Sequence, residues 1–390
     1  MSPRLRLDPE QVLRTLEPLE RATMLPPPAF TDQAVLDWEL HEFFGRGWIC
    51  AAHVSAIAEP GAWVMRELGD QSFFVIRGKD GVPRAFHNVC RHRGARLFEE
   101  ERGRTRARIT CPYHAWSYGF DGELLGARAT EGIEDFDASC YGLVPLRTEV
   151  VGGLVMVDLG GEAAPVAKLV GDLAGWLDRY RTPELAVGGE RFYEVEANWK
   201  AIAENYNECL HCPGVHPELN ALSSYDSGEA VVGDGAWCGG SMTLNEGAGT
   251  MSKNGGHAAR PPIAGLEPDD LSSVYYYALF PNALVSLHPD YVMLHTLWPR
   301  SPGHTTVTCE WLFERETIAA DGFDPSDAID FWDNVNRQDW HVCELTQMGV
   351  RSRGYVAGRY TTHEYDVHAF DRMVAERYMA ALHAQSPVAP

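Results

Sequence analysis

One stretch of the chain, residues 198–217 (NWKAIAENYNECLHCPGVHP), constrains the fold and the chemistry more than any other. Apolar residues recur in it at spacings of three and four, which predicts a helix with one buried face. That face would consist of Trp199, Ile202, Tyr206 and Leu210. Three polar residues at similar spacings would lie together on the opposite face: Glu204, Glu208 and His211.

The end of this helix is predicted to bring in a second histidine. Pro213 and Gly214 should stop the helix, and His216 follows just past the turn, five residues after His211. Both imidazoles can then point at one centre. Two histidines and one carboxylate from elsewhere form the facial triad that holds non-haem Fe(II) and leaves positions for O₂. A solvated helix face with two incidental histidines is the alternative interpretation of this stretch alone.

The composition excludes several classes of protein. A chain of 390 residues is long enough for one or two domains with real cores. Its 33 basic and 55 acidic residues give a net charge of -22, which argues against nucleic-acid partners and anionic membranes. No apolar run has the length of a signal peptide or a membrane span, so we expect a cytoplasmic protein. The nine cysteines do not resemble a disulfide framework, and clustered ones are expected to bind metal.

Two loops in the first half of the chain predict an iron–sulfur site. Residues 48–86 alternate β-rich runs with turns, which indicates a small antiparallel sheet. The loops that follow carry Cys90 with His92 and Cys111 with His114, in the pattern C-x-H, eighteen residues, C-x-x-H. Both cysteines can bind one iron of a Rieske [2Fe–2S] cluster and both histidines the other. A structural Cys₂His₂ zinc site is the alternative, although zinc fingers usually group the two cysteines together and the two histidines together.

These motifs resemble those of a known family, the Rieske oxygenase α subunits of the aromatic-ring-hydroxylating type. CRHRGARL (residues 90–97) and CPYHAWSYGFDGEL (residues 111–124) are similar to the cluster-binding loops of that family, and residues 198–217 resemble its mononuclear-iron motif. The resemblance extends from about Pro26 to about residue 372. It implies an α+β fold, with an N-terminal antiparallel β Rieske domain and a C-terminal helix-grip catalytic domain. It also implies two cofactors, a [2Fe–2S] cluster and a mononuclear Fe(II).

Changes in the sequence pattern predict the domain boundaries. Residues 1–44 are expected to form an N-terminal arm and helix, and residues 45–160 the Rieske domain. The segment GGEAAP marks the next boundary, so residues 161–390 are expected to form the catalytic domain. Within it, residues 220–272 are rich in Gly, Ser, Asn and Asp and are expected to form a long excursion over the site.

Asp339 is the residue predicted to complete the iron site. The last long helix of the chain should begin near Asp324 and Pro325. Its buried stripe is expected to comprise Trp332, Val335, Val342, Cys343 and Thr346. Asp339 falls within that stripe, where a carboxylate is costly unless it is paired or bound to metal, and the motif of the family falls at the same place. The alternative is a buried salt bridge with Arg337, Arg351 or Arg353.

The resemblance further implies a head-to-tail homotrimer, in which the cluster of one subunit lies near the mononuclear iron of its neighbour. A carboxylate three residues before the first iron histidine bridges the two centres, and here that position is Glu208. By its spacing, Glu208 could bond the ring nitrogen of His211 that faces away from iron. Asn205 and Glu204, near the iron on the same helix, are candidates for contacts with the ligands or the substrate.

Glu208 also bears on the substrate. Most relatives carry Asp at this position, whereas Glu resembles the branch that acts on quaternary ammonium compounds such as carnitine, glycine betaine and stachydrine. The predicted reaction is O₂-dependent monooxygenation of an N-methyl group, which yields a hemiaminal that loses formaldehyde. A cationic substrate should meet an aromatic cage, with Tyr206, Trp237 and residues 275–277 as candidates, although aromatic residues in strands usually belong to the core.

The electrons must come from a partner protein. No flavin or nicotinamide motif appears in the chain, so a separate NAD(P)H-dependent flavin and iron–sulfur reductase is expected. Two other functions stay open at this point. One is an oxygenase of the same architecture that hydroxylates an aromatic ring, and the other is a Rieske electron carrier with an accessory domain, which would need no second metal.

Overall fold

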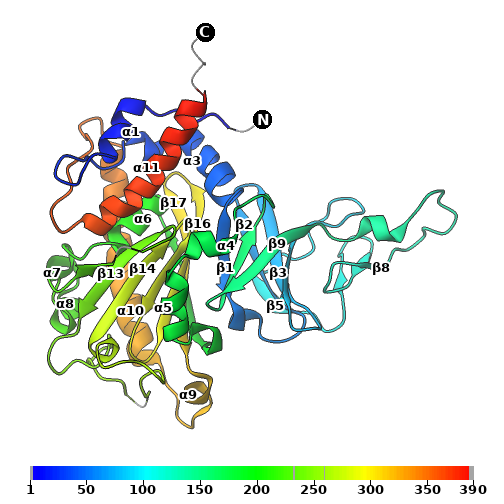
Figure 1. Ribbon diagram of the computed structural model, residues 1–390. Coiled ribbons are helices and arrows are strands. Elements are labelled where there is room, and N and C mark those ends of the chain that lie inside the picture. Colours follow the sequence, from blue (N-terminus) through cyan, green and yellow to red (C-terminus); the bar gives the residue numbers. More distant parts are fainter. Residues whose placement is uncertain (1–2, 232, 259, 386–390) are drawn as a thin grey trace. The chain divides into compact units, whose positions relative to one another are not determined.

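The computed structural model describes residues 3–231, 233–258 and 260–385, which form two compact units (Figure 1). One unit is Phe43–Val166, and the other combines the chain before it with the chain after it. In that second unit, α1 (Pro9–Thr15) lies beside α11 (Tyr365–Gln385). The two helices are linked there, because the Nε2 atom of His368 is 3.0 Å from the carbonyl oxygen of Thr15. The N-terminal segment therefore packs against the C-terminal helix and forms a hydrogen bond with it.

The unit Phe43–Val166 is built from antiparallel strands, because apolar runs alternate with Gly and Pro turns. Its larger sheet has the order β1-β10-β9-β4-β3-β2-β5. Those strands are β1 Trp48–His53, β2 Ala62–Leu68, β3 Gln71–Arg77, β4 Pro83–His87, β5 Arg102–Arg104, β9 Pro145–Val151 and β10 Leu154–Asp158. A second sheet pairs β6 (Ile109–Thr110), β7 (Ser117–Tyr118) and β8 (Leu124–Gly126). The first cysteine loop lies between β4 and β5, and the second between β6 and β7.

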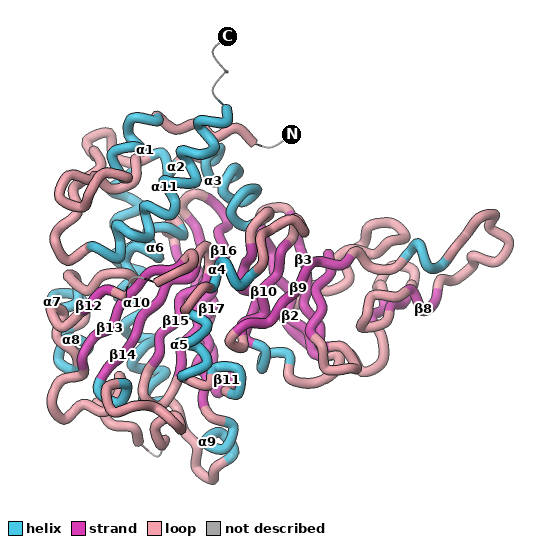
Figure 2. Tube along the Cα trace, viewed as in Figure 1, coloured by secondary structure: helices cyan, strands magenta, loops and turns pink. Residues whose placement is uncertain are grey.

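A seven-stranded antiparallel sheet forms the centre of the second unit, with the order β11-β17-β16-β15-β14-β13-β12 (Figure 2). Its strands are β11 Ala186–Val195, β12 Glu229–Ala230, β13 Trp237–Thr243, β14 Ser273–Leu279, β15 Ala283–Leu287, β16 Val292–Ser301 and β17 His304–Phe313. The further helices are α2 Pro28–Thr31, α3 Gln33–Glu39, α4 Val166–Val170, α5 Leu173–Arg179, α6 Trp199–Tyr206, α7 Cys212–Val215, α8 Pro217–Leu222, α9 Arg315–Ala319 and α10 Ser326–Val350. The predicted α+β class, with an antiparallel β domain followed by a sheet-and-helix domain, is confirmed.

The two faces of this sheet carry different helices, and β14 shows how its side chains divide between them. Successive side chains of a strand point to opposite faces. Tyr275 and Tyr277 point to the face of α5, where the ring of Trp176 lies 4.6 Å and 5.6 Å from theirs. Tyr276 points to the opposite face, 5.9 Å from Tyr206 of α6 and 6.3 Å from Trp332 of α10. The face that carries Tyr276 is the one on which the candidate site lies.

Two segments of this unit differ from the sequence prediction. Residues 220–272 are only partly an excursion, because they also contribute β12 and β13, which form one edge of the sheet. The helix α10 is not the last long helix, because α11 follows it. The sequence did not reveal α11 because buried polar residues such as His368 and Asp371 interrupt its apolar pattern.

Candidate active site and iron–sulfur site

His211, His216 and Asp339 meet at one point of the second unit. The Oδ1 atom of Asp339 lies 2.8 Å from Nε2 of His216 and 3.1 Å from Nε2 of His211. One donor atom from each residue lies within 4.8 Å of the others. Donor atoms about 2.1 Å from a shared metal ion would be about 3 Å apart, so the observed spacing fits one ion. Two imidazoles and one carboxylate are also the donor set that suits non-haem iron.

The helix that begins this stretch is shorter than predicted. It ends at Tyr206, and Pro213 and Gly214 lie inside the separate short helix α7. The amide Nδ2 of Asn207 donates to the carbonyl oxygen of Ala203 at 2.7 Å, and such side-chain bonds to the backbone compete with helix continuation. His211 therefore precedes α7, and His216 lies between α7 and α8.

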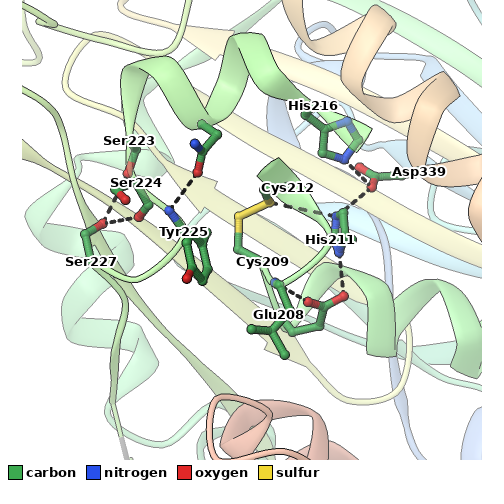
Figure 3. Close-up of a disulfide and its surroundings, with 12 residues drawn as sticks. Glu208, Cys209, His211, Cys212, His216, Ser223, Ser224, Tyr225, Ser227 and Asp339 are labelled. Atoms are coloured by element: carbon green, nitrogen blue, oxygen red, sulfur yellow. Dashed lines mark hydrogen bonds and ion pairs between the residues drawn. A yellow bond between two sulfur atoms is a disulfide. The ribbon is translucent and has the colours of Figure 1, made fainter. Parts of the chain in front are cut away.

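A disulfide between Cys209 and Cys212 encloses His211, as Figure 3 shows. The sequence prediction for clustered cysteines, that they bind metal, is wrong for this pair. The seven other cysteines are free. The disulfide closes a four-residue loop, so it restricts the backbone that carries His211.

Two further side chains contact the Nδ1 atoms of His211 and His216, the ring nitrogens that do not face Asp339. Glu208 Oε1 lies 2.5 Å from Nδ1 of His211, and its other oxygen accepts from the backbone nitrogen of Leu210 at 2.5 Å. Gln338 Oε1 lies 2.7 Å from Nδ1 of His216. Outer partners of this kind fix the tautomer and the orientation of a ligating histidine. Glu208 was predicted for such a contact, whereas Gln338 was missed, and its only sequence signal is that it precedes Asp339.

The charges of the site depend on one another. Burial alone would lower the pKa of His211, but the hydrogen bonds to Asp339 and Glu208 raise it to about 10. Burial alone would raise the pKa of Asp339, but the hydrogen bonds with His211 and His216 lower it. A metal ion that binds here must therefore displace protons from the imidazoles.

Asp339 lies at the edge of the buried stripe of α10. Its side chain is 16% exposed, whereas Val342 is only half-buried and Thr346 is exposed, contrary to the predicted stripe. The buried residues of α10 are Ala328, Ile329, Phe331, Trp332, Val335, Asn336, Trp340, Cys343, Gln347 and Val350. The alternative of a salt bridge with Arg337 is not seen, because Arg337 pairs with Asp333 at 2.9 Å.

Asn205 and Glu204 have separate environments. Asn205 lines the cavity that contains the triad. Glu204 does not line this cavity. Burial is the main cause that raises the pKa of its carboxyl, and the charge of the neighbouring Asp371 is the second. It lies near Lys200, whose Nζ atom forms a fully buried ion pair with Glu39 at 2.7 Å. The prediction that Glu204 contacts the iron ligands or the substrate is therefore not supported.

A cavity with an empty volume of about 1060 Å³, partly open to solvent, contains the triad. Of the candidate cage residues, Tyr206 and Tyr276 line it, and Trp332 and Trp340 of α10 add two indoles. Trp237 belongs to the opposite face, where its ring lies 5.0 Å from that of Tyr277. Strand alternation therefore decides which of the predicted aromatic residues reach the cavity.

In the first unit, the two loops present their cysteines and histidines differently. Cys90 and Cys111 are each 2% exposed and belong to one hydrophobic cluster. Each loop is a tight turn closed on its cysteine: Ala115 N donates to Cys111 O at 3.1 Å, and Gly94 N donates to Cys90 O at 3.0 Å. Burial, and then the neighbouring Cys90 thiol, raise the pKa of Tyr118, whose hydroxyl lies 3.2 Å from the Cys90 sulfur.

The two histidines lie together at the end of these loops. The rings of His92 and His114 are 4.7 Å apart, and His92 stacks on Trp116 at 4.8 Å. The Nδ1 atom of His114 is buried and has no hydrogen-bond partner among the described residues. An orphaned imidazole nitrogen beside a second imidazole and two buried thiols fits a cluster with mixed ligands.

Two family models match the chain. A model described as the Rieske [2Fe-2S] domain matches residues 47–137, and one described as the ring hydroxylating alpha subunit (catalytic domain) matches residues 183–380. The chain belongs to the Rieske oxygenase α subunits. The α subunit thus has a Rieske [2Fe–2S] domain and a catalytic domain that implies a mononuclear iron, and it is an oxidoreductase.

Relatives of this α subunit include oxygenases of quaternary ammonium compounds. It is 30% identical to the glycine betaine monooxygenase oxygenase subunit of Pseudomonas aeruginosa (strain UCBPP-PA14), over 95% of each chain. It is 31% identical to the carnitine monooxygenase oxygenase subunit of Escherichia coli (strain K12), over 86% of each chain. The quaternary ammonium Rieske monooxygenase CntA with its substrate gamma-butyrobetaine has a similar structure, with a TM-score of 0.79 and 27% identity, over 96% of this chain and 99% of that one. Among the described residues of the α subunit, no helix has the length and apolarity to cross a bilayer.

Proposed function

We propose that this α subunit is the oxygenase component that removes an N-methyl group from a small quaternary ammonium substrate, such as a betaine, by O₂-dependent monooxygenation. The observation that carries the proposal is the cavity itself. It joins the His211, His216 and Asp339 cluster to six tyrosine and tryptophan side chains, and among the described residues no lysine or arginine lines it. Aromatic faces and an excess of negative charge favour a cation.

The residues that would hold each iron centre come from the triad in the cavity and from the two cysteine–histidine loops. His211, His216 and Asp339 hold Fe(II), and Cys90, His92, Cys111 and His114 hold the [2Fe–2S] cluster. When bound, the cluster supplies single electrons and the mononuclear iron activates O₂. Gln338 keeps the His216 ring oriented through its Nδ1 atom, and Asn205 faces the cavity as a candidate substrate contact. The aromatic side chains exclude water from the substrate.

Glu208 is the proposed link between the two centres. Its contact with Nδ1 of His211 leaves Nε2 free to face the metal, which is the arrangement that a bridging carboxylate needs. In the proposed homotrimer, it would join His211 to a cluster histidine of the adjacent subunit. A separate NAD(P)H-dependent flavin and iron–sulfur reductase would deliver the electrons, and the proposed location is the cytoplasm.

Formaldehyde release tests the proposed reaction. The purified protein, with a surrogate reductase, NADH and O₂, should release formaldehyde from one or more members of a panel of betaines and other N-methylated ammonium compounds. Consumption of O₂ that depends on aromatic acids and not on the ammonium panel would instead indicate a ring-hydroxylating oxygenase. A preparation that contains cluster iron only, and whose EPR spectrum does not change when Fe(II) is added, would indicate an electron carrier.

A further inference from the structure

One carboxylate in the cavity takes no part in the iron site. Asp366 lies in the first turn of α11 and lines the same cavity as the triad. Within the described part of the chain, no hydrogen bond or ion pair to its carboxylate is found, and burial alone raises its pKa to about 7. A half-buried carboxylate without a partner is costly to keep charged, so a cation placed beside it would gain a favourable interaction.

The register of the sheet places this carboxylate beside Tyr276. A Cβ atom on Gly240 of β13 would lie 3.3 Å from Oδ2 of Asp366. Gly240 is the direct partner of Tyr276 in β14, and cross-strand partners project from the same face with their Cβ atoms about 5 Å apart. Asp366 and Tyr276 are therefore neighbours on the face of the sheet that carries the iron triad.

Tyr276 connects this carboxylate to the aromatic part of the cavity. Its ring lies 5.9 Å from Tyr206 and 6.3 Å from Trp332, and its buried hydroxyl has no hydrogen-bond partner among the described residues. Burial, and then the charge of the nearby triad residue Asp339, raise the pKa of this hydroxyl. An ammonium group against Tyr276 would thus be close to both an aromatic face and a free carboxylate.

In the described part of the chain, no lysine or arginine of the lining would compete with such a ligand. Apart from its histidines, of which His211 and His216 are the proposed metal ligands, the charged residues of the lining are acidic: Glu208, Glu229, Asp339 and Asp366. Burial lowers the pKa of His295 to about 4, so this imidazole is neutral at pH 7. Glu208 already pairs with His211 and Asp339 with His216, and Glu229 is exposed to solvent. Asp366 is the carboxylate left for the ligand.

We propose that Asp366 is the counter-ion for the ammonium group of the substrate, and that it selects a positively charged ligand over a neutral one of the same shape. This deepens the proposed function and rests on it. The carboxylate and the face of Tyr276 together recognise the charge, because a tetraalkylammonium has no N–H to donate and is held by Coulomb attraction and cation–π contact. Gly240 allows the approach, since a side chain there would meet the carboxylate and the carbonyl oxygen of Glu229.

Direct binding to the iron-loaded protein tests the proposal without turnover. Calorimetric titrations under anaerobic conditions, with no reductase, would compare tetramethylammonium, choline and 3,3-dimethyl-1-butanol, the neutral carbon analogue of choline. We expect the native protein to bind choline more tightly than the neutral analogue. Asp366→Asn should weaken the binding of both cations at least about tenfold and leave the neutral analogue unchanged. Glu376→Gln, an exposed site on the same helix, is the control for the change in net charge.

Each outcome supports or contradicts a distinct statement. Equal affinity of the native protein and the Asp366→Asn variant for both cations would overturn the counter-ion role and leave the oxygenase proposal intact. Failure of the native protein to bind any cation would contradict both. A purely structural role for Asp366 predicts a lower melting temperature for Asp366→Asn, whereas loss of an unpaired buried charge should maintain or raise it. If that variant does not fold, equal affinity of the native protein for choline and its neutral analogue still overturns the proposal.

Discussion

The Nε2 atom of His216 lies 2.8 Å from Oδ1 of Asp339, a residue 123 positions later in the chain. The histidine is 1% exposed and lies between α7 and α8, whereas the carboxylate belongs to α10. Such a contact between two distant segments means that the metal-binding atoms are brought together by the fold before a metal arrives. A preformed site loses less conformational entropy when its ion binds.

Loss of His216 should remove the mononuclear iron and spare the cluster. We expect His216→Ala to bind Fe(II) much more weakly, because two donors cannot replace the triad. Iron analysis should then give the content of the cluster alone, and the EPR spectrum of the reduced cluster should be unchanged. His341→Ala, an exposed histidine on α10, is the matched control. Retention of full iron content in His216→Ala would show that the metal lies elsewhere.

Glu208→Gln should separate metal binding from catalysis. The amide can still contact His211 but cannot carry the negative charge that the bridge requires. We expect both iron sites to stay occupied and turnover to slow about 100-fold, the upper range for outer partners of metal ligands. Stopped-flow absorbance would show the defect as slower reoxidation of the reduced cluster by O₂ in the presence of substrate. Normal turnover in this variant would remove Glu208 from the path of the electrons.

The affinity for tetramethylammonium should depend on pH through Asp366. Burial raises the pKa of Asp366 to about 7, so its charge appears as the pH rises from about 6 to about 8, and cation binding should tighten over that window. Burial and the charges of Asp366 and Glu229 raise the pKa of Tyr365, and burial raises that of Cys238, so both stay neutral there. The dependence should vanish in Asp366→Asn, with His363→Gln, a change at an exposed histidine of the lining, as the control. A pH dependence that survives in Asp366→Asn would assign it to another group.

The raised pKa of Asp366 also makes the stability of the fold depend on pH. Cation binding should tighten as the pH rises, whereas the contribution of Asp366 to stability should fall. The folded chain keeps a proton on Asp366 that the unfolded chain releases above a pKa of 3.8. The contribution of this group to the free energy of unfolding therefore falls as the pH rises from about 3.8 to about 7, and is constant above that. Comparison of denaturant midpoints for the native protein and Asp366→Asn across this range would measure it. A gap between the two proteins that does not change with pH would contradict the assignment.

Removal of the disulfide should loosen the segment around His211. The bond between Cys209 and Cys212 closes a short loop, so its loss should lower the free energy of unfolding by about 2 kcal/mol. We expect Cys209→Ser to release Fe(II) faster to a chelator, with cluster absorbance unchanged. Cys140→Ser, an exposed free cysteine, is the control. If thiol titration of the unfolded native protein finds the same number of thiols before and after reduction, the disulfide is absent in solution.

The sequence predicted the features that depend on local spacing. The C-x-H and C-x-x-H loops, and the pair His211 and His216, could be recognised because each motif needs only a few consecutive residues. Asp339 was chosen because a carboxylate near a buried stripe needs a partner, and the structure places that carboxylate against the two histidines. The end of α6 was mispredicted because the hydrogen bond of the Asn207 side chain to Ala203 leaves no trace in the pattern of apolar residues.

The sequence by itself determined the types of donor atoms, their order and the class of fold, since these follow from chemistry and periodicity within short segments. The tertiary structure alone decided that Glu204 faces Asp371, that Gln338 supports His216 and that Asp366 lies beside Tyr276. These pairs join segments far apart in the chain, and strand register and helix ends set their distances. A shift of one residue in β14 would turn Tyr276 to the other face, and no local pattern records that choice.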